Sequence, residues 1–244
     1  MTHRFFVPAD QFSGHEVRFT QVQAHQLEHV LRLQQGDEVR VFDGARPCDL
    51  VVELISPETG RVVGEARHAP EPRTALHLYP ALLQRDKFEQ VLQKLTELGA
   101  AAITPIRTER GLVREPPDER RYARWRRIIQ EAAEQSGRGR IPVLLPVVPL
   151  REALQTSSGM RVVAYEGERQ LTLREVLRSQ PTHLSLFVGP EGGFGVDEIT
   201  HARDAGAHIV TLGPRVLRTE TASPVLAALV LYELGDLSWR DHDH

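Results

Sequence analysis

A glycine-rich segment near residue 190 has the clearest chemical character in this sequence. It reads Gly-Pro-Glu-Gly-Gly-Phe over residues 189–194 and directly follows the apolar run Leu184–Val188. Glycines let a backbone approach a ligand closely and adopt positive φ angles. The spacing is neither that of a dinucleotide-binding turn nor that of a P-loop, and Glu191 puts a carboxylate where a pyrophosphate would lie. The segment therefore favours a ligand whose hydroxyl or amine groups donate to Glu191; a tight turn whose glycines serve only packing is the alternative.

Charged residues are concentrated in a second segment, residues 211–223, between an apolar run and a predicted helix. Arg215 and Arg218 are candidates for holding an anion, because a guanidinium stays charged and presents a rigid fork of donors. Glu220 adds a carboxylate two residues after Arg218. The segment predicts either an anion-binding loop or surface ion pairs between these arginines and Glu220.

The end of another predicted helix carries a third cluster. Glu131 and Gln135 are four residues apart and share a helix face, and Arg138 and Arg140 follow Gly137, which ends the helix. A helix end followed by a basic segment suits a phosphate backbone. A solvated helix C-terminus, with cations near the negative end of the helix dipole, explains the same residues.

Charge is distributed unevenly along the 244 residues, although the formal net charge is only -3. Residues 1–72 hold 7 arginines and 11 acidic residues, a net charge of -4. Residues 107–140 hold 10 arginines and 6 acidic residues, a net charge of +4. A face that binds nucleic-acid phosphates would therefore begin in the second of these segments, and a solvated helix laced with ion pairs is equally compatible.

Composition and motifs exclude several classes of protein. A chain that is 41% hydrophobic and 26% charged is ordinary for a globular protein, and no apolar run reaches the roughly 20 residues of a membrane span. The histidines form no H-E-x-x-H pair, the single Cys48 leaves zinc without cysteine ligands, and no G-x-S-x-G elbow is present. We therefore expect no metal, no disulfide and no membrane contact. The N-terminus lacks the apolar core of a secretory signal, so we expect a cytoplasmic protein in which Cys48 is a small core residue.

Two domains are expected to carry these segments, over residues 1–72 and 73–244. In the first, Glu38–Phe42, a turn at Asp43-Gly44 and Leu50–Ile55 predict strands of a small β-barrel or sheet. Apolar residues at near-helical spacing over Val22–Leu33 predict one inserted helix, with His29 and Arg32 on its polar side. Residues 68–73 contain two prolines and no periodicity, which predicts a linker.

The second domain is expected to alternate strands with helices six times. This alternation predicts a parallel sheet covered by helices on both faces, an α/β fold in which ligands bind at the carboxyl ends of the strands. Thr221 or Ser223 is the expected N-cap of the last helix, with Pro224 in its first turn. The predicted strands are Leu76–Leu82, Ala101–Ile106, Ile141–Leu145, Arg161–Tyr165, Leu184–Val188 and His208–Leu212, and the predicted helices are Phe88–Leu98, Tyr122–Gln135, Leu150–Leu154, Leu173–Leu177, Val196–Ala205 and Val225–Leu234.

Taken together, these residues resemble the RsmE-type ribosomal RNA uridine N3-methyltransferases, members of the knotted SPOUT class. The resemblance runs in order along nearly the whole chain, and its most specific parts are the two loop segments above. Its matching segments are Arg4–Phe6, His29–Arg32, Gly36-Asp37, Phe42–Gly44, Gln93–Gly99, Pro105, Thr108–Arg110, Arg124-Trp125, Glu131–Arg138, Gly189–Phe194 and Leu212–Ala222. One departure is that Gln84–Lys87 stands where the family pattern has a Lys-Gly pair, which leaves the role of that loop open. Arginine also outnumbers lysine by 28 to 2.

The resemblance implies a PUA-like β-barrel followed by a SPOUT methyltransferase domain with a deep trefoil knot, a homodimer, and S-adenosylmethionine as cofactor. It places the cofactor, bent, against loops near residues 165, 189 and 212. The helix Val225–Leu234, apolar on nearly every face, is consistent with burial in the dimer interface. The cofactor contacts that the resemblance implies are Tyr165, Gly189, Glu191, Gly192, Leu212, Gly213, Val216, Leu217, Arg218 and Thr219.

For the reaction, the resemblance implies methylation of uracil N3 of one uridine in the decoding region of 16S rRNA, with the assembled small subunit as substrate. Arg218 is expected to stabilise the uracil anion, and Arg215 or Arg138 to hold a phosphate. Arginine cannot be the base, which leaves Glu191, Glu220 or solvent. The expected RNA contacts are Arg4, Arg18, Arg32, Arg110, Arg138, Arg140 and Arg215.

Other functions remain open at this point. Methylation of a ribose 2′-oxygen on another RNA would use the same fold. A non-catalytic RNA-binding or ribosome-assembly factor would keep the fold without the reaction, although Gly189, Glu191 and Arg218 are all present. A nucleotide-phosphate enzyme is disfavoured because of Glu191.

Overall fold

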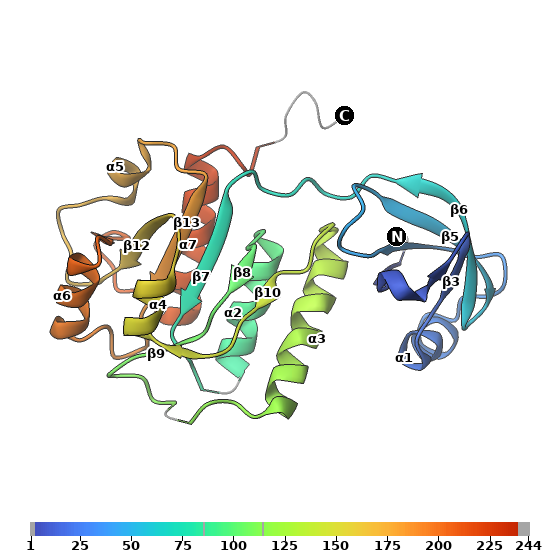
Figure 1. The fold of residues 1–244 in the computed structure, drawn as a ribbon, viewed down its shortest axis with the longest axis horizontal. Helices are drawn as coiled ribbons and strands as arrows, with labels where there is room; N and C mark the ends of the chain where they lie inside the picture. The colour runs from blue at the N-terminus through green and yellow to red at the C-terminus, as the bar shows by residue number, and fades with distance from the viewer. Residues whose placement is uncertain (1–2, 85, 114, 239–244) are drawn as a thin grey trace. The chain divides into compact units, whose positions relative to one another are not determined.

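The computed structural model describes residues 3–84, 86–113 and 115–238, and these form two compact units. Of the described residues, those before Pro72 form the first unit together with Ala133–Ile141, and all others form the second. The prediction of two consecutive domains did not include this returning segment. Figure 1 shows the elements of both units.

The first unit is built on one six-stranded sheet in the order β1-β4-β5-β6-β3-β2. Strand β1 pairs with β4 in parallel, and the other neighbours are antiparallel. Alternate residues of these strands point inward, so that Phe5, Val17, Val39, Val41 and Val52 share one buried cluster. The strands are β1 (Arg4–Phe6), β2 (Phe12–Ser13), β3 (Glu16–Arg18), β4 (Glu38–Phe42), β5 (Asp49–Ser56) and β6 (Thr59–Ala66).

The inserted helix of this unit exists, and Leu27, Leu31 and Leu33 of its predicted apolar side pack against the sheet, but Val22 and Val30 do not. It comprises α1 (Gln21–His25), which a capping box between Thr20 and Gln23 begins, and a π-helical continuation over Gln26–Val30. The wider turn changes which residues face the sheet, because the π-helix adds residues to each turn. Val22 and Val30 are consequently 68% and 66% exposed, whereas Gln23 is buried.

The second unit contains a six-stranded parallel sheet in the order β10-β8-β7-β13-β12-β14 and a parallel pair of β9 and β11. The predicted alternation of strands and helices is confirmed, except that the strand expected over 101–106 is divided into two short ones. The strands are β7 (Ala75–Pro80), β8 (Ala102–Ile103), β9 (Ile106–Arg107), β10 (Val143–Leu144), β11 (Val148–Pro149), β12 (Met160–Ala164), β13 (His183–Val188) and β14 (His208–Val210). The helices are α2 (Asp86–Glu97), α3 (Glu119–Ser136), α4 (Leu150–Thr156), α5 (Leu173–Leu177), α6 (Val196–Asp204) and α7 (Thr219–Glu233). The end of α3, from Ala133 onward, belongs to the first unit.

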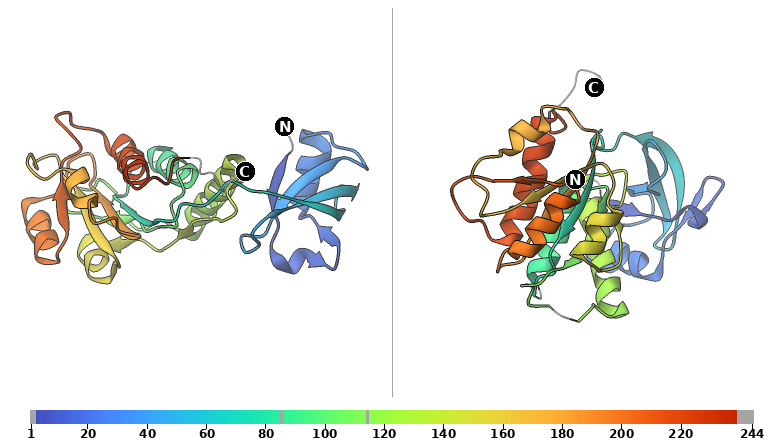
Figure 2. Two further views of the ribbon diagram at one scale, coloured as in Figure 1. Left: turned by 90° about the horizontal axis from the view of Figure 1, so that it is seen from above. Right: turned by 60° about the vertical axis from the view of Figure 1, so that its left-hand side comes forward.

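Helices cover both faces of this sheet (Figure 2). Helix α7 packs on β7 and β13 beside α2, and α6 packs on β14 beside α4. At the centre, the Tyr79 ring of β7 stacks on the Phe187 ring of β13 with 4.4 Å between centroids. Burial on both faces explains why these strands are continuous apolar runs in the sequence.

Helix α7 begins six residues earlier than predicted, and the predicted caps are wrong. Arg218 is the N-cap residue, and Thr219 is already helical and buried. Ser223 lies inside the helix, where its hydroxyl donates to the Thr219 carbonyl. Pro224 therefore lies within the helix instead of marking its first turn. None of the helices described in residues 3–84, 86–113 and 115–238 is both long enough and apolar enough to span a bilayer.

Candidate active site

Three neighbouring strands of the second unit, β13, β12 and β14, run in parallel, so their carboxyl ends meet at one edge of the sheet. The loops that follow them line a cavity of about 210 Å³. The cavity lies where ligands of open α/β sheets bind. Its lining consists of Ala164, Tyr165, Glu166, Val188, Gly189, Pro190, Glu191, Gly192, Gly193, Thr211, Leu212, Gly213, Arg215, Val216, Leu217, Thr219 and Ala222.

Every predicted cofactor contact except Arg218 lines this cavity. The lining also includes residues that the sequence did not indicate as cofactor contacts, among them Glu166, Thr211 and Arg215. Glu166 follows β12 by two residues and carries no local motif, so only the alignment of β12 beside β13 brings it here.

The glycine-rich loop holds its shape through two features. Gly193 has φ +68°, and a Cβ at this position would collide with the carboxylate of Glu166. The Thr219 hydroxyl at the start of α7 donates to the Gly189 carbonyl over 2.8 Å, which ties the loop after β13 to the loop after β14. The loop therefore requires glycine for its backbone angle, and a side chain at this position would also displace the exposed Glu166 carboxylate.

Two carboxylates meet one ammonium group beside this cavity. Lys87 Nζ lies 3.1 Å from Glu191 Oε1 and 3.4 Å from Glu220 Oε1. The side chain of Glu220 is 16% exposed, and its Oε2 atom is buried without a hydrogen-bond partner among the described residues. Hydrogen bonding to Glu191 raises the pKa of Lys87, so that the ammonium group stays charged at neutral pH.

Sequence reasoning did not identify Lys87 as a site residue. The signal for it was the departure from the family pattern at residues 84–87, which was interpreted only as uncertainty about that loop. Lys87 is more than 100 residues from both glutamates in the sequence, and tertiary packing brings them together, in the case of Glu220 that of α2 against α7.

The arginines of the second loop are exposed. Neither Arg215 nor Arg218 forms a side-chain hydrogen bond or an ion pair with any residue that the structure describes, so no ion pair with Glu220 explains them. On the opposite side of the glycine-rich loop, Arg110 Nη1 donates to the Gly192 carbonyl over 3.3 Å. Unpaired guanidinium groups at the mouth of a cavity are available for an anionic ligand or for a developing negative charge.

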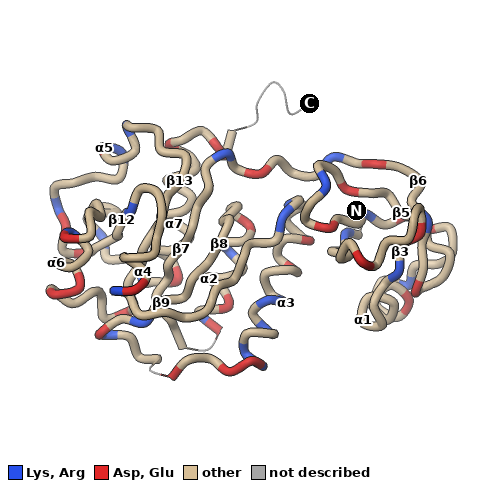
Figure 3. Tube along the Cα trace, in the orientation of Figure 1, with Lys and Arg blue, Asp and Glu red and all other residues tan. Residues whose placement is uncertain are grey.

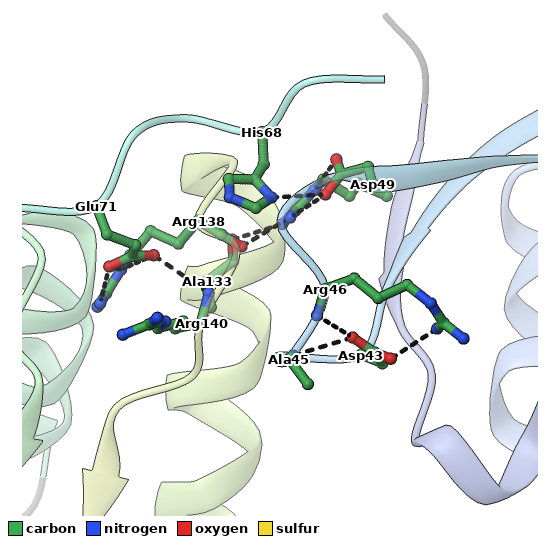
Figure 4. A network of polar contacts seen from close by, with 10 residues as sticks. Asp43, Ala45, Arg46, Asp49, His68, Glu71, Ala133, Arg138 and Arg140 are labelled. Carbon is green, nitrogen blue, oxygen red and sulfur yellow. Dashed lines mark hydrogen bonds and ion pairs between the residues drawn. The ribbon is translucent and has the colours of Figure 1, made fainter. Parts of the chain in front are cut away.

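Two of the predicted RNA contacts, Arg4 and Arg138, are instead buried in the first unit, and Figure 4 shows Arg138 beside Glu71. Arg4 donates to both oxygens of Asp49 over 2.7 Å and to the carbonyls of Ala133 and Arg138. The Arg138 guanidinium pairs with Glu71 over 2.6 Å. We therefore propose no RNA contact for either arginine, because both guanidinium groups hold this unit together.

The boundary between the two units falls between Glu71 and Pro72, within the linker predicted over residues 68–73, but the first part of that linker is bonded to the first unit. The Ala69 amide donates to the Gly137 carbonyl, and Glu71 also accepts from the Arg140 amide. Residues 68–71 are thus fixed to the segment that follows α3 within the first unit.

The remaining predicted RNA contacts are exposed. Arg32 and Arg140 both present their side chains to solvent, and Arg32 has φ +55°. Basic residues also recur along α3, as the blue segments of Figure 3 show. On this helix Arg124, Arg126 and Arg127 form ion pairs with glutamates at the surface, and such pairs contribute little to stability.

A histidine of β7 lies inside the sheet, opposite Ser185 of β13. The His77 ring stacks on Tyr79, and its Nε2 shares a 2.7 Å hydrogen bond with the Thr104 hydroxyl. Burial lowers the pKa of His77 from 6.5 to about 4, so the ring is neutral at physiological pH. Within the described part of the chain, no three histidine, cysteine, aspartate or glutamate side chains gather in a way that would hold a metal ion.

Comparison with known proteins gives consistent results. The model of an RNA methyltransferase domain matches residues 70–231. Ribosomal RNA small subunit methyltransferase E from Synechocystis is 34% identical, over 94% of this chain and 77% of that protein. The protein of the same name from Bacillus subtilis is 30% identical, over 96% of this chain and 91% of that protein.

Solved structures agree with the sequence relatives. The ribosomal RNA small subunit methyltransferase E of Neisseria gonorrhoeae, bound to S-adenosyl methionine, superposes with a TM-score of 0.88 at 30% identity, covering 98% of this chain and 100% of that one. A methyltransferase from Legionella pneumophila with bound S-adenosylmethionine gives a TM-score of 0.86 at 29% identity, covering 95% of this chain and 98% of that one. The chain therefore has the α/β methyltransferase fold and belongs to the ribosomal RNA small subunit methyltransferase E family.

Proposed function

We propose that this protein transfers the methyl group of S-adenosylmethionine to N3 of one uridine in the decoding region of 16S rRNA. The observation that carries the proposal is the cavity at the ends of β12, β13 and β14, where glycine-rich loops meet the Lys87–Glu191–Glu220 cluster. The names and bound ligand of the relatives support an rRNA methyltransferase that uses S-adenosylmethionine. The choice of N3 follows the family resemblance.

The cavity fits such a cofactor. Residues of the loops after β13 and β14 line it, and a side chain at Gly193 would displace the Glu166 carboxylate that also lines it. Glu191 lines the cavity and is positioned to accept hydrogen bonds from an amine or a ribose hydroxyl. S-adenosylmethionine supplies an activated sulfonium methyl group, and the electron pair of the breaking carbon–sulfur bond remains on sulfur.

The chain must then remove the N3 proton and stabilise the resulting charge. Arg218 at the N-terminus of α7 is free to donate to a uracil carbonyl oxygen as negative charge develops there. Glu191 and Glu220 are the available proton acceptors beside the cavity. N3 takes part in base pairing, so the uridine must be unpaired or flipped out of its stack before it reaches these residues.

We propose that phosphates of the RNA lie against the exposed arginines of both units, Arg18, Arg32, Arg110, Arg140 and Arg215. The assembled small subunit is the proposed substrate. A homodimer is supported by exposed apolar residues at α7 and the loop before it, where Val216, Leu229 and Tyr232 are 81%, 43% and 68% exposed. The trefoil knot of the loops, the PUA-like character of the first unit and a cytoplasmic location are further parts of the proposal.

The experiment is to incubate the protein and methyl-labelled S-adenosylmethionine with unmodified small subunits and, separately, with naked rRNA. The RNA is then digested and the labelled nucleoside identified. Label in 3-methyluridine supports the proposal, and comparison of the substrates shows whether assembly is required. Label in a 2′-O-methyl nucleoside would overturn the assignment of N3. Absence of label from both substrates would overturn the proposed activity.

A further inference from the structure

Lys87 contacts both Glu191 and Glu220, and its position indicates a different role for each glutamate. The inference rests on the proposed function. Lys87 lies in the first turn of α2, where the helix dipole disfavours a cation. Its position there is explained by the two carboxylates, which both accept from its ammonium group through their Oε1 atoms.

Glu220 differs from Glu191 in how its second oxygen is placed. Glu220 Oε2 is buried and has no hydrogen-bond donor among the described residues, whereas Glu191 is more exposed, at 27%, and lines the cavity itself. A buried acceptor without a donor costs about 1–3 kcal/mol, so an unpaired carboxylate oxygen in a native protein calls for an explanation, of which a catalytic role is one. The N–H group at N3 of uracil is a donor of the required kind.

We propose that Lys87 is a positioning residue that holds Glu220 by Oε1, and that Glu220 Oε2 accepts the N3 proton of the uridine. The proton moves from N3 to Oε2, and the electron pair that it leaves on N3 forms the bond to the methyl carbon. The protonated Glu220 then returns its proton to solvent. Glu191, held by the same ammonium group, binds the cofactor and takes no proton.

Several charged groups act on this proton transfer. Lys87 faces it from α2, Glu220 from α7, and Glu191 from the loop after β13. Arg218 lies at the start of α7, Arg110 contacts the glycine-rich loop, and Glu166 and Arg215 line the cavity. Of these, only Lys87 contacts both carboxylates among the described residues, so its removal changes their charge balance most directly.

The chain offers a matched control, because its other lysine lies on the same helix. Lys94 is exposed and pairs with Glu97 on α2, away from the cavity lining. We expect Lys87→Met to lower kcat about tenfold or more and to move the acidic limb of the pH–kcat profile upward by about one pH unit, because loss of the cation favours a protonated carboxylate. Lys87→Arg should restore the limb, and Lys94→Met should leave kcat and the profile unchanged.

A role for Lys87 in folding alone predicts a different result. It would lower kcat by the same factor at every pH and would lower the melting temperature in parallel, with no shift of the limb. That outcome would overturn the positioning role.

Glu220 is tested with a readout that does not depend on turnover. In the presence of S-adenosylhomocysteine, binding of uridine monophosphate and 3-methyluridine monophosphate is measured by NMR titration. The wild type should bind uridine monophosphate about tenfold more tightly, because only that ligand carries the N3 donor. Glu220→Met should abolish this preference, and Glu191→Gln should keep it while weakening the binding of S-adenosylhomocysteine.

Measurements of kcat complete the test of Glu220. Glu220→Gln, which has nearly the same shape, should lower kcat by about 10²–10⁴-fold with little change in cofactor affinity. If the wild type produces 3-methyluridine and Glu220→Gln keeps its kcat, the inference is wrong and the proposed function stands. If the wild type labels a different nucleoside, the proposed function itself has failed.

Discussion

Replacement of Gly193 by alanine tests whether the glycine-rich loop forms the cofactor site. Gly193 has φ +68°, and the added Cβ would meet the carboxylate of Glu166 inside the cavity lining. A left-handed conformation costs a non-glycine residue about 1–2 kcal/mol, which lowers the melting temperature of a chain of this size by about 2–8 °C. The added Cβ also displaces the Glu166 carboxylate, which lines the same cavity, so we expect the affinity for S-adenosylmethionine to fall about tenfold or more.

Gly206 provides the matched control. It lies in the same unit with φ +77°, but a Cβ there would meet open space. Gly206→Ala should therefore lower the melting temperature by a similar amount and leave cofactor affinity unchanged. Both variants are compared by thermal unfolding and by titration calorimetry with S-adenosylmethionine. Wild-type affinity in Gly193→Ala would refute the assignment of this loop.

Three other perturbations follow from the structure. Burial lowers the pKa of His77 in the folded chain to about 4, so the unfolded chain takes up a proton first as the pH falls below 6.5. The free energy of unfolding should therefore fall by about 1–2 kcal/mol more between pH 7 and pH 5 in the wild type than in His77→Gln, as measured by urea unfolding at the two pH values. Arg4→Met removes the arginine that pairs with the buried Asp49 carboxylate and should lower the free energy of unfolding by about 3–5 kcal/mol in the same assay. The control Arg18→Met, at an exposed position, should lower it by under about 0.5 kcal/mol, and equal effects would contradict the role of the buried pair. Arg32→Glu should weaken binding to small subunits in a filter assay. It should also make the slope of log K against log salt concentration shallower by the contribution of about one phosphate contact. An unchanged slope would exclude Arg32 from the RNA interface.

Local sequence patterns were sufficient for most of the second unit. The apolar run over β13 and the turn residues after it specify a buried strand that ends at a ligand-binding loop. The predicted and observed bounds of α5, Leu173–Leu177, are identical because Thr172 and Glu175 form a capping box that sets its start. Periodicity and capping are local, so the sequence alone reveals them.

Features that depend on distant packing were not predicted. The start of α7 was misplaced because Pro224 was interpreted as a first-turn residue, whereas the hydrogen bond from Thr219 to the Gly189 carbonyl anchors the helix earlier. Similarly, nothing near Arg138 in the sequence indicates that Glu71 will bury it. A basic residue that follows a helix can face solvent, bind a phosphate or form an internal ion pair. Only the tertiary structure shows which of these environments it has.

The candidate site likewise combines residues that local sequence patterns indicate with a residue that only distant packing brings there. Glycines and charged residues of the loops after β13 and β14 indicated a ligand site, and most of the cavity lining comes from them. Lys87 was missed because its two partners lie on other elements, and its relation to them is a matter of tertiary structure.

The central claim is that the protein methylates N3 of a single uridine in the decoding region. A methyl group on N3 occupies the Watson–Crick edge of the base and therefore stops a reverse transcriptase that copies the RNA. We would treat unmodified small subunits with the protein, with and without S-adenosylmethionine, and copy the 16S rRNA. Methylation of N3 predicts one strong stop, in the decoding region, that appears only with S-adenosylmethionine. A transcript that reads through this region, or stops that depend on the cofactor elsewhere, would contradict it.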